Sequence, residues 1–343
     1  MDKSGAGAYI FAKASGNLGK SFIDSRVHQL FEQKTLAELW TLLFKTQVPM
    51  VPEVILAEQI ERESFSLFLK DYVNFLNQYD NPDPILKDLL CVYQAENIKL
   101  LIAALCNGES AMPEVKELGR LDKLNYKAWP DISRITRGTQ YSWINHVPDI
   151  HEQQEIDFKV DIQVVKHLWQ SLENQTGESK DALIKLFKAE FAVKNIVWAL
   201  RLRTYFKMEK EDVVKKLIYV TDRPCAMDPV AGPALKILDT PLDEYDAWTD
   251  WKYSELINPH VDGEVWNIDP GWIENKGRAK LNKMALNIFH QYPMSTASLV
   301  GWYKIKEYEL SCIRTAVESI RLNINPEEAM NAVGIVAEGG LNG

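Results

Sequence analysis

The stretch TASLVGWYKIKEYELSCIRTAVESIRL, residues Thr296–Leu322, decides the fold class of this chain. Its apolar side chains recur at the spacing of one helix face, with one turn skipped at Lys306, and this period predicts an amphipathic α-helix. The stripe consists of Leu299, Tyr303, Leu310, Ile313, Val317 and Ile320. Ser295 or Thr296 follows Pro293 and is well placed to cap the helix N-terminus. We therefore expect one long helix of about 35–40 Å, at 1.5 Å per residue.

This helix belongs to the third copy of a unit that recurs along the chain. In each copy an Ile followed by an acid opens a long helical stretch: Ile60-Glu61, Ile156-Asp157 and Ile273-Glu274. The next apolar helix carries Asn97-Ile98, Asn195-Ile196 or Cys312-Ile313. The separations from the first Ile to the Asn or Cys are 37, 39 and 39 residues. Spacing this constant indicates one supersecondary unit used three times.

A further anchor marks the start of each copy. A Thr-Gln pair closes an apolar run at Thr46-Gln47 and again at Thr139-Gln140, and Trp251 stands at the matching point of the third copy. We expect three helical repeats, over residues 1–113, 114–232 and 233–343. Repeats of this kind usually build a surface for other proteins.

The remainder of the chain also has helical spacing or composition, with Pro and Gly gathered between the helices. The predicted helices are Ser21–Gln33, Leu36–Lys45, Val54–Asn77, Asp83–Cys106, Asp161–Asn174, Lys180–Lys207, Lys210–Tyr219, Arg278–Tyr292, Thr296–Leu322 and Pro326–Ala332. Strand-like alternation is scarce. The predicted fold class is all-α.

Composition and charge exclude some classes of function. The 343 residues are 46% hydrophobic and 25% charged, which is ordinary for a globular protein. The net charge of −9 argues against a nucleic-acid partner, because phosphate binding needs a basic surface. The four cysteines form no CxxC pair, which fits a reduced, cytoplasmic setting. We expect no stretch that approaches the 18–20 apolar residues of a membrane span, and no signal peptide.

The segment Ala14–Ser21, ASGNLGKS, offers an enzymatic alternative. It satisfies a permissive form of the phosphate-binding loop, with Ala14 where the first Gly usually stands. A nucleotide-binding domain, however, needs a parallel sheet of alternating strands and helices, and the chain shows almost none. We expect an N-terminal turn or helix of small residues here, with a nucleotide-binding enzyme as the alternative.

Other residues that could carry chemistry have plainer interpretations. Glu307 and Glu309 are two apart on a helix and would point to different faces, so they do not form a catalytic pair. His146 and His151 are expected in a loop, without the converging ligands of a metal site. The tryptophans of Trp248–Trp272 are expected to pack a loop-rich region. We predict no cofactor, no metal and no catalytic residue.

Four segments carry a resemblance to a known family. They are the aromatic opening Tyr9–Lys13, the leucine-rich turns Leu36–Gln47 and Ile132–Tyr141, the helix Glu190–Arg203, and the closing segment Ser298–Arg314. Together they resemble the C-type subunit of the V-type/A-type ATPase, the equivalent of the d subunit of the vacuolar enzyme. Cys312 stands where that family usually has Asn. The segments Trp248–Trp272 and Asp149–Asp161 have no counterpart that we can place.

The resemblance implies three similar helical bundles around a pseudo-threefold axis, forming a funnel. Members of the family are non-catalytic rotor subunits that sit on the cytoplasmic face of the membrane proteolipid ring and receive the central stalk. The implied partners are therefore the stalk subunits and the ring, with no nucleic acid and no membrane span of the chain's own. A generic helical scaffold for other proteins is a third hypothesis.

The best candidates for functional residues lie on the long helices. They are Lys194, Arg201, Arg203, Glu307 and Arg314. Their side chains could join one repeat to the next or contact a partner, and the sequence leaves both alternatives open.

Overall fold

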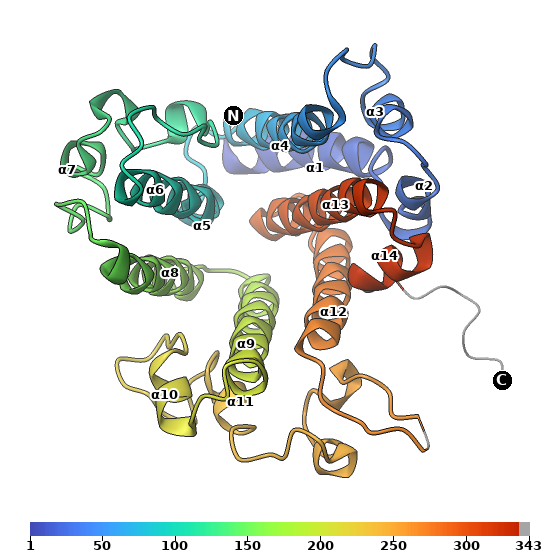
Figure 1. Cartoon of the computed structure of the whole chain (residues 1–343). Coiled ribbons are helices and arrows are strands. Elements are labelled where there is room, and N and C mark those ends of the chain that lie inside the picture. The colour runs from blue at the N-terminus through green and yellow to red at the C-terminus, as the bar shows by residue number, and fades with distance from the viewer. Residues whose placement is uncertain (262, 336–343) are drawn as a thin grey trace. The chain divides into compact units, whose positions relative to one another are not determined.

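The computed structural model describes residues 1–261 and 263–335 (Figure 1). Helices make up 62% of it, and these residues contain no strand, which confirms the all-α class. The chain divides into two compact units. Unit 1 combines Met1–Asn81, Gly177–Leu217 and the chain from Thr221 onward, and unit 2 combines Pro82–Thr176 with Ile218–Val220. The division into three repeats remains a prediction from the sequence.

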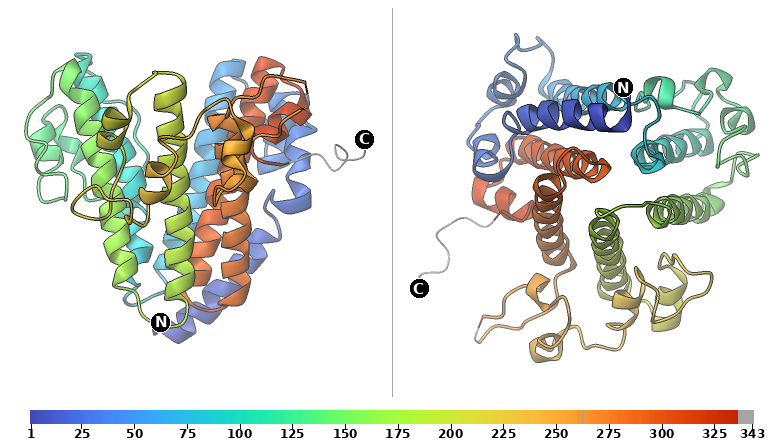
Figure 2. Two further views of the ribbon diagram at one scale, coloured as in Figure 1. Left: turned by 90° about the horizontal axis from the view of Figure 1, so that it is seen from below. Right: turned by 180° about the vertical axis from the view of Figure 1, so that it is seen from behind.

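Unit 1 is built around four long helices. These are α4 (Glu53–Leu76), α9 (Lys180–Thr204), α12 (Pro270–Gln291) and α13 (Thr296–Leu322). Its other helices are α1 (Lys3–Leu18), α2 (His28–Phe31), α3 (Leu36–Phe44), α10 (Lys210–Lys215), α11 (Gly232–Leu235) and α14 (Pro326–Ala332). Helices α12 and α13 run side by side as an antiparallel pair, α1 packs along α13, and α9 packs on α12 (Figure 2).

Unit 2 is built around the long helix α8 (Ile150–Glu173). Its shorter helices are α5 (Pro84–Asp88), α6 (Cys91–Cys106) and α7 (Ile132–Ile135). Helix α8 packs on both α5 and α6. The indole of Trp143 donates a hydrogen bond to Gln163 of α8, so the loop that precedes α8 is fixed to the helix it enters.

Local capping explains where the long helices begin. The Ser295 side chain accepts a hydrogen bond from the Ser298 N–H, as expected for the N-terminal cap of α13. Helix α8 begins with a capping box in which Asp149 and Glu152 each bond the other's backbone N–H. The sequence prediction placed the start of this helix at Asp161, eleven residues late, because the polar first turns weaken the apolar period.

Other helix boundaries also differ from the prediction. The predicted helix Ser21–Gln33 is only a 3₁₀ turn at Asp24–Arg26 followed by the four-residue α2. The predicted helix Asp83–Cys106 is interrupted between α5 and α6. Helix α12 begins at Pro270, eight residues before the predicted start, and Asp269 caps it. In contrast, α13 and α14 have the predicted bounds.

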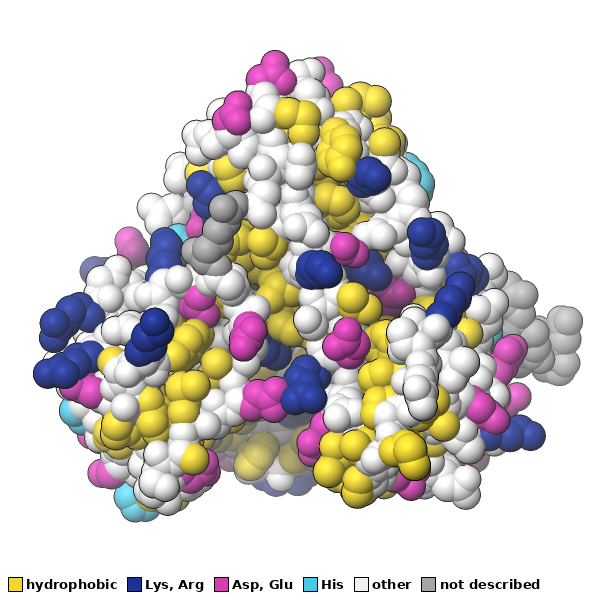
Figure 3. Space-filling model, turned by 90° about the horizontal axis from the view of Figure 1, so that it is seen from above, with side chains coloured by type: hydrophobic (Ala, Val, Ile, Leu, Met, Phe, Trp, Pro, Cys, Tyr) yellow, Lys and Arg dark blue, Asp and Glu magenta, His cyan; other side chains and the backbone are white. Residues whose placement is uncertain are grey.

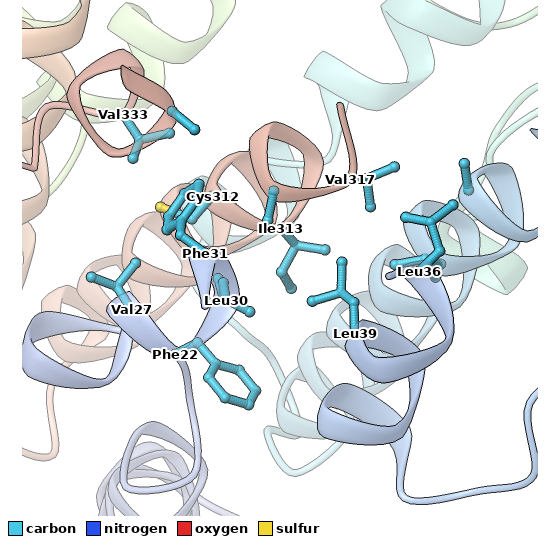
Figure 4. Packing of buried hydrophobic residues seen from close by; sticks show 14 of the residues in the cluster. Phe22, Val27, Leu30, Phe31, Leu36, Leu39, Cys312, Ile313, Val317 and Val333 are labelled. Carbon is cyan, nitrogen blue, oxygen red and sulfur yellow. The ribbon is translucent and has the colours of Figure 1, made fainter. Parts of the chain in front are cut away.

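The first and last parts of the chain share one hydrophobic core. Apolar side chains from α2 and α3, including Leu30, Phe31 and Leu39, meet Ile313 and Val317 of α13 (Figure 4). Helices α4 and α14 complete this core. Contacts between segments so distant in sequence tie the terminal segments of unit 1 together.

The recurring residues occupy similar buried positions. Ile60, Ile156 and Ile273 are all buried in their units. The Asn97 amide donates to the Lys116 carbonyl and Asn195 donates to the Val230 carbonyl, at 2.8 and 3.1 Å. Asn97 therefore fixes the loop that follows α6, and Asn195 fixes the segment between α10 and α11. Cys312 instead packs in the shared core.

One segment is apolar enough to require comment. Pro84–Cys106, the α5–α6 segment, spans 23 residues with a mean hydropathy of 1.5, so it could cross a membrane by length and composition alone. The expectation that no such stretch exists was therefore wrong by this measure. In the structure 56% of its apolar window is buried within the protein, as in the core helix of a globular domain.

Candidate functional site

A groove of about 230 Å³ lies between three long helices of unit 1. Helices α9 and α13 both pack on α12, and each contributes polar and apolar side chains to the groove. The lining residues are Leu186, Glu190, Val193, Lys194, Glu274, Arg278, Leu281, Asn282, Lys304, Glu307, Tyr308 and Ser311. Half of these residues are charged, so the groove concentrates charge on a face where helices meet.

The groove contains an ion-pair network centred on Lys304. Its ammonium nitrogen lies 3.0 Å from a carboxylate oxygen of Glu190 on α9 and 2.9 Å from one of Glu307 on its own helix. Lys194 approaches Glu190 from the same helix at 2.9 Å. The Glu190 and Lys304 side chains are only 12% and 13% exposed. Two buried opposite charges thus connect α9 to α13.

The surroundings of this network hold both groups in their charged forms. Burial alone would raise the pKa of Glu190, but Lys194 and Lys304 outweigh it and hold that pKa well below its usual range. Burial alone would lower the pKa of Lys304, but Glu190 and Glu307 outweigh it and raise that pKa. The pair therefore stays ionised at all physiological pH values.

A second ion-pair network lies at the α9–α12 side of the groove. The Arg201 guanidinium donates to Glu274 at 2.5 Å, and Arg278 lies 3.4 Å from the other oxygen of the same carboxylate. Arg278 also donates to the Ser311 hydroxyl of α13 at 3.2 Å. These contacts run from α9 through α12 to α13.

The structure places the predicted site residues in different surroundings. Lys194 and Glu307 line the groove, and Arg201 joins it through Glu274. Arg203 donates to the carbonyls of Ile237 and Thr240, so it holds the chain that follows α11. Arg314 pairs with Glu61 of α4 at 3.0 Å. The five residues do not converge on one point.

Several groove residues were missed as site candidates from the sequence. Glu274, Arg278 and Asn282 lie on the part of α12 where the sequence pattern carries no functional signal. Helix spacing alone pairs Glu190 with Lys194 and Lys304 with Glu307 within their own helices, but it does not place Glu190 beside Lys304. The contact between Glu190 and Lys304 joins two different helices, so no pattern within either helix could have identified it.

The phosphate-loop alternative does not fit the structure. Ala14–Leu18 is the last part of helix α1, which begins at Lys3 without a preceding strand in the described residues. A phosphate-binding loop needs a run of backbone N–H groups that face the ligand, whereas the N–H groups of a helix interior are used within the helix. The nucleotide-binding interpretation of these residues was therefore wrong.

Glu307 and Glu309 point in different directions, as their spacing predicts. Glu309 accepts a hydrogen bond from the Phe22 N–H at 2.6 Å and pairs with Lys306. Glu307 faces the groove and pairs with Lys304. Glu309 thus fixes the segment after α1, and Glu307 completes the ion-pair network of the groove.

The histidines lie in separate places. His146 approaches Glu152 at 3.7 Å, and His167 lies 3.0 Å from Asp88. His151 is in the first turn of α8, so its predicted loop position was wrong. Within the residues that the structure describes, no three His, Cys, Asp or Glu side chains are grouped to hold a metal ion.

The Trp-rich segment packs as predicted at Trp248, Trp251 and Trp266, whereas Trp272 lies on helix α12. Trp248 and Trp266 are buried, and their indoles donate to the carbonyls of Pro241 and Asn258. The ring of Trp251 meets that of Trp248 edge to face at 5.4 Å. Aromatic packing therefore gives this loop-rich region a core of its own.

On the molecular face in Figure 3, basic and acidic side chains are interspersed.

Sequence comparison adds the evolutionary context. An uncharacterized protein of Treponema pallidum (strain Nichols) is 28% identical over 324 residues, which cover 93% of this chain and 94% of that relative. The family model described as ATP synthase (C/AC39) subunit matches residues 12–332. That match spans both compact units, so this chain belongs to the ATP synthase (C/AC39) subunit family.

Proposed function

We propose that this protein is a non-catalytic subunit of the central rotor of a V/A-type rotary ATPase. In this role it caps the membrane proteolipid ring on the cytoplasmic face and receives the central stalk, so that ATP hydrolysis or synthesis is coupled to ion transport. The observation that carries the proposal is the family match over residues 12–332. The three-bundle funnel and the peripheral, cytoplasmic location belong to the same proposal.

The groove supports a mechanical role over a chemical one. Its most deeply buried charges, Glu190 and Lys304, are paired with each other, which is a structural use of charge. The ion pairs connect helices that are far apart in sequence, and a rotor element has to keep such helices in place under torque. We infer that the groove preserves the shape of the protein.

The predicted site residues then divide by exposure. Lys194 and Arg314 are 65% and 67% exposed even though each has an ion-pair partner. Their charges remain accessible to a protein of the stalk or the ring. Arg201, Arg203 and Glu307 are less exposed and engaged within the chain, and we assign them to the inner structure of the protein.

Co-purification tests the proposal. A tagged full-length chain expressed in its native cells is expected to bring down both stalk and proteolipid subunits, and an unrelated acidic helical protein with the same tag should bring down neither. The isolated chain should show no ATP-dependent rise in melting temperature. Recovery of neither class of partner would refute the rotor role and favour a generic helical scaffold. An ATP-dependent stabilisation would instead revive nucleotide binding.

A further inference from the structure

Three helix pairs share one packing arrangement that the sequence repeats do not reveal directly. Within unit 2, α6 packs on α8; within unit 1, α9 packs on α12 and α13 packs on α4. In each case the helix with the Asn–Ile or Cys–Ile pair lies against a helix that carries an Ile–acid pair. These two helices come from different predicted repeats in all three cases.

An ion pair crosses each of these interfaces. Lys99 of α6 contacts Asp161 of α8 at 2.5 Å, and Arg201 of α9 contacts Glu274 of α12 at 2.5 Å. Arg314 of α13 contacts Glu61 of α4 at 3.0 Å. The cation always comes from the helix with the Asn–Ile or Cys–Ile pair, and the carboxylate always comes from the helix with the Ile–acid pair.

The positions of these residues within the repeats also correspond. Lys99 and Arg314 both stand two residues after the Asn or Cys, and Arg201 stands one helical turn further on. Glu61 and Glu274 are the acids of the Ile–acid pairs, and Asp161 stands one turn beyond its own. A shift of one turn keeps a side chain on the same helix face, so the three ion pairs are equivalent.

We propose that these three ion pairs form one recurring recognition surface through which each repeat selects the Ile–acid helix of another repeat. The α6–α8 joint is Lys99 with Asp161, the α9–α12 joint is Arg201 with Glu274, and the α13–α4 joint is Arg314 with Glu61. This inference rests on the repeats in the sequence and not on the proposed rotor role. The surface fits a helix that carries a buried Ile and, either directly after it or one turn further on, a carboxylate that can reach the cation.

The exposure of these pairs indicates what they contribute. Arg314 is 67% exposed, and partly exposed ion pairs add little to stability, since water screens them and the long side chains lose freedom. Their effect is on specificity, because a like charge placed opposite would disfavour the wrong helix or a slipped register.

The α6–α8 joint contains two acids of α8 near the cation Lys99. Asp157, the acid directly after Ile156, lies one turn before Asp161, and its Oδ1 is buried without a hydrogen-bond partner among the described residues. Burial raises the pKa of Asp157 and the charge of Lys99 opposes that shift. The charge of Lys99 therefore acts on both carboxylates, but Lys99 forms its ion pair with Asp161. In this joint the ion pair lies one helical turn later than in the α13–α4 joint, and Asp157, the acid directly after the Ile, does not take part in it.

Charge exchange tests the proposal in the full-length chain. Arg314→Glu would place two carboxylates in the α13–α4 joint, and hydrogen exchange in Glu53–Leu76 and Thr296–Leu322 should become about 3–10-fold faster. Adding Glu61→Arg should return the exchange to within about 2-fold of the wild type. Lys99→Glu alone and with Asp161→Lys should give the same pattern for α6 and α8.

The control pair is Lys159 with Glu155, an ion pair within α8 that crosses no joint. Exchanging these two charges should leave hydrogen exchange unchanged. The proposal is overturned if the double variant at a joint shows hydrogen exchange as fast as that of the single variant at the same joint. Recovery at only one of the two tested joints would overturn the equivalence on which it depends. Because both double variants keep the net charge of the chain, a general charge effect cannot explain recovery.

Discussion

Replacing Lys304 with methionine is expected to lower the free energy of unfolding by about 3 kcal/mol, the low end of the range for a broken buried ion pair, because Glu190 keeps only its exposed partner Lys194. Methionine keeps an apolar side chain of similar length, whereas the ammonium that forms the ion pairs and lies 5.1 and 5.8 Å from the ring centroids of Phe187 and Tyr303 is lost, so the loss comes from the charge. Equilibrium unfolding in denaturant, followed by circular dichroism, measures the change.

The pH dependence of stability supplies a second readout of the same variant. Glu190 has a depressed pKa in the folded wild type, so its contribution is present above its ordinary value of 4.5 and is lost as the pH falls. In Lys304→Met the pKa of Glu190 should rise, because burial then faces only Lys194. The acid-side loss of stability should therefore become shallower. Lys304 has a raised pKa, so its own contribution is lost only as the pH rises above 10.5.

Lys194→Met is the matched control, because Lys194 contacts the same carboxylate of Glu190 from an exposed position. We expect this substitution to cost less, about 1 kcal/mol, because water screens the exposed charge of Lys194 although its partner Glu190 is largely buried. Equal losses in the two variants would contradict the account, since they would show that burial of Lys304 does not matter.

Replacing Trp302 with alanine is expected to cost about 3–5 kcal/mol, because it opens a cavity in the fully buried contact between α13 and α4. The indole packs against aromatic rings of α4, with centroid distances of 5.9 Å to Phe68, 6.3 Å to Tyr72 and 5.0 Å to Phe75. Alanine leaves most of the volume of the indole unfilled. Thermal and denaturant unfolding of the variant measure the loss.

Two further variants separate packing from other effects. Trp302→Phe should cost much less than Trp302→Ala, since a ring remains and the substitution removes a buried indole N–H that has no hydrogen-bond partner in the described part of the chain. Trp198 is 38% exposed and its indole donates to the Lys216 carbonyl, so Trp198→Ala should cost about 1 kcal/mol. A Trp302→Ala variant as stable as Trp198→Ala would contradict the assigned role of this aromatic cluster.

The helices whose apolar period is strong could be predicted closely from the sequence. Helix α13 has its predicted bounds because an apolar stripe, a Ser cap and a preceding Pro all indicate the same start. Helix α8 was predicted too short because its first turns are polar and its start depends on a capping box at Asp149. The apolar residues of Ser21–Gln33 resemble a helix, but they pack against α13, and this tertiary contact permits a 3₁₀ turn.

The candidate site was only partly predictable, for a physical reason. Lys194 and Glu307 could be selected as polar residues of long helices, and their partners one turn away follow from helix geometry. The contact of Glu190 with Lys304 joins residues 114 positions apart, and no local pattern contains it. Glu274 was noted only as the acid of a repeat, and its contact with Arg201 depends on how α9 packs on α12.

The most direct test of the central claim is a density map of the intact ATPase complex that contains this chain. The account predicts an all-helical body on the rotation axis, between the central stalk and the proteolipid ring, into which the structure of each unit fits. A complex in which another protein fills that position, or in which this chain lies outside the rotor, would contradict the proposed function.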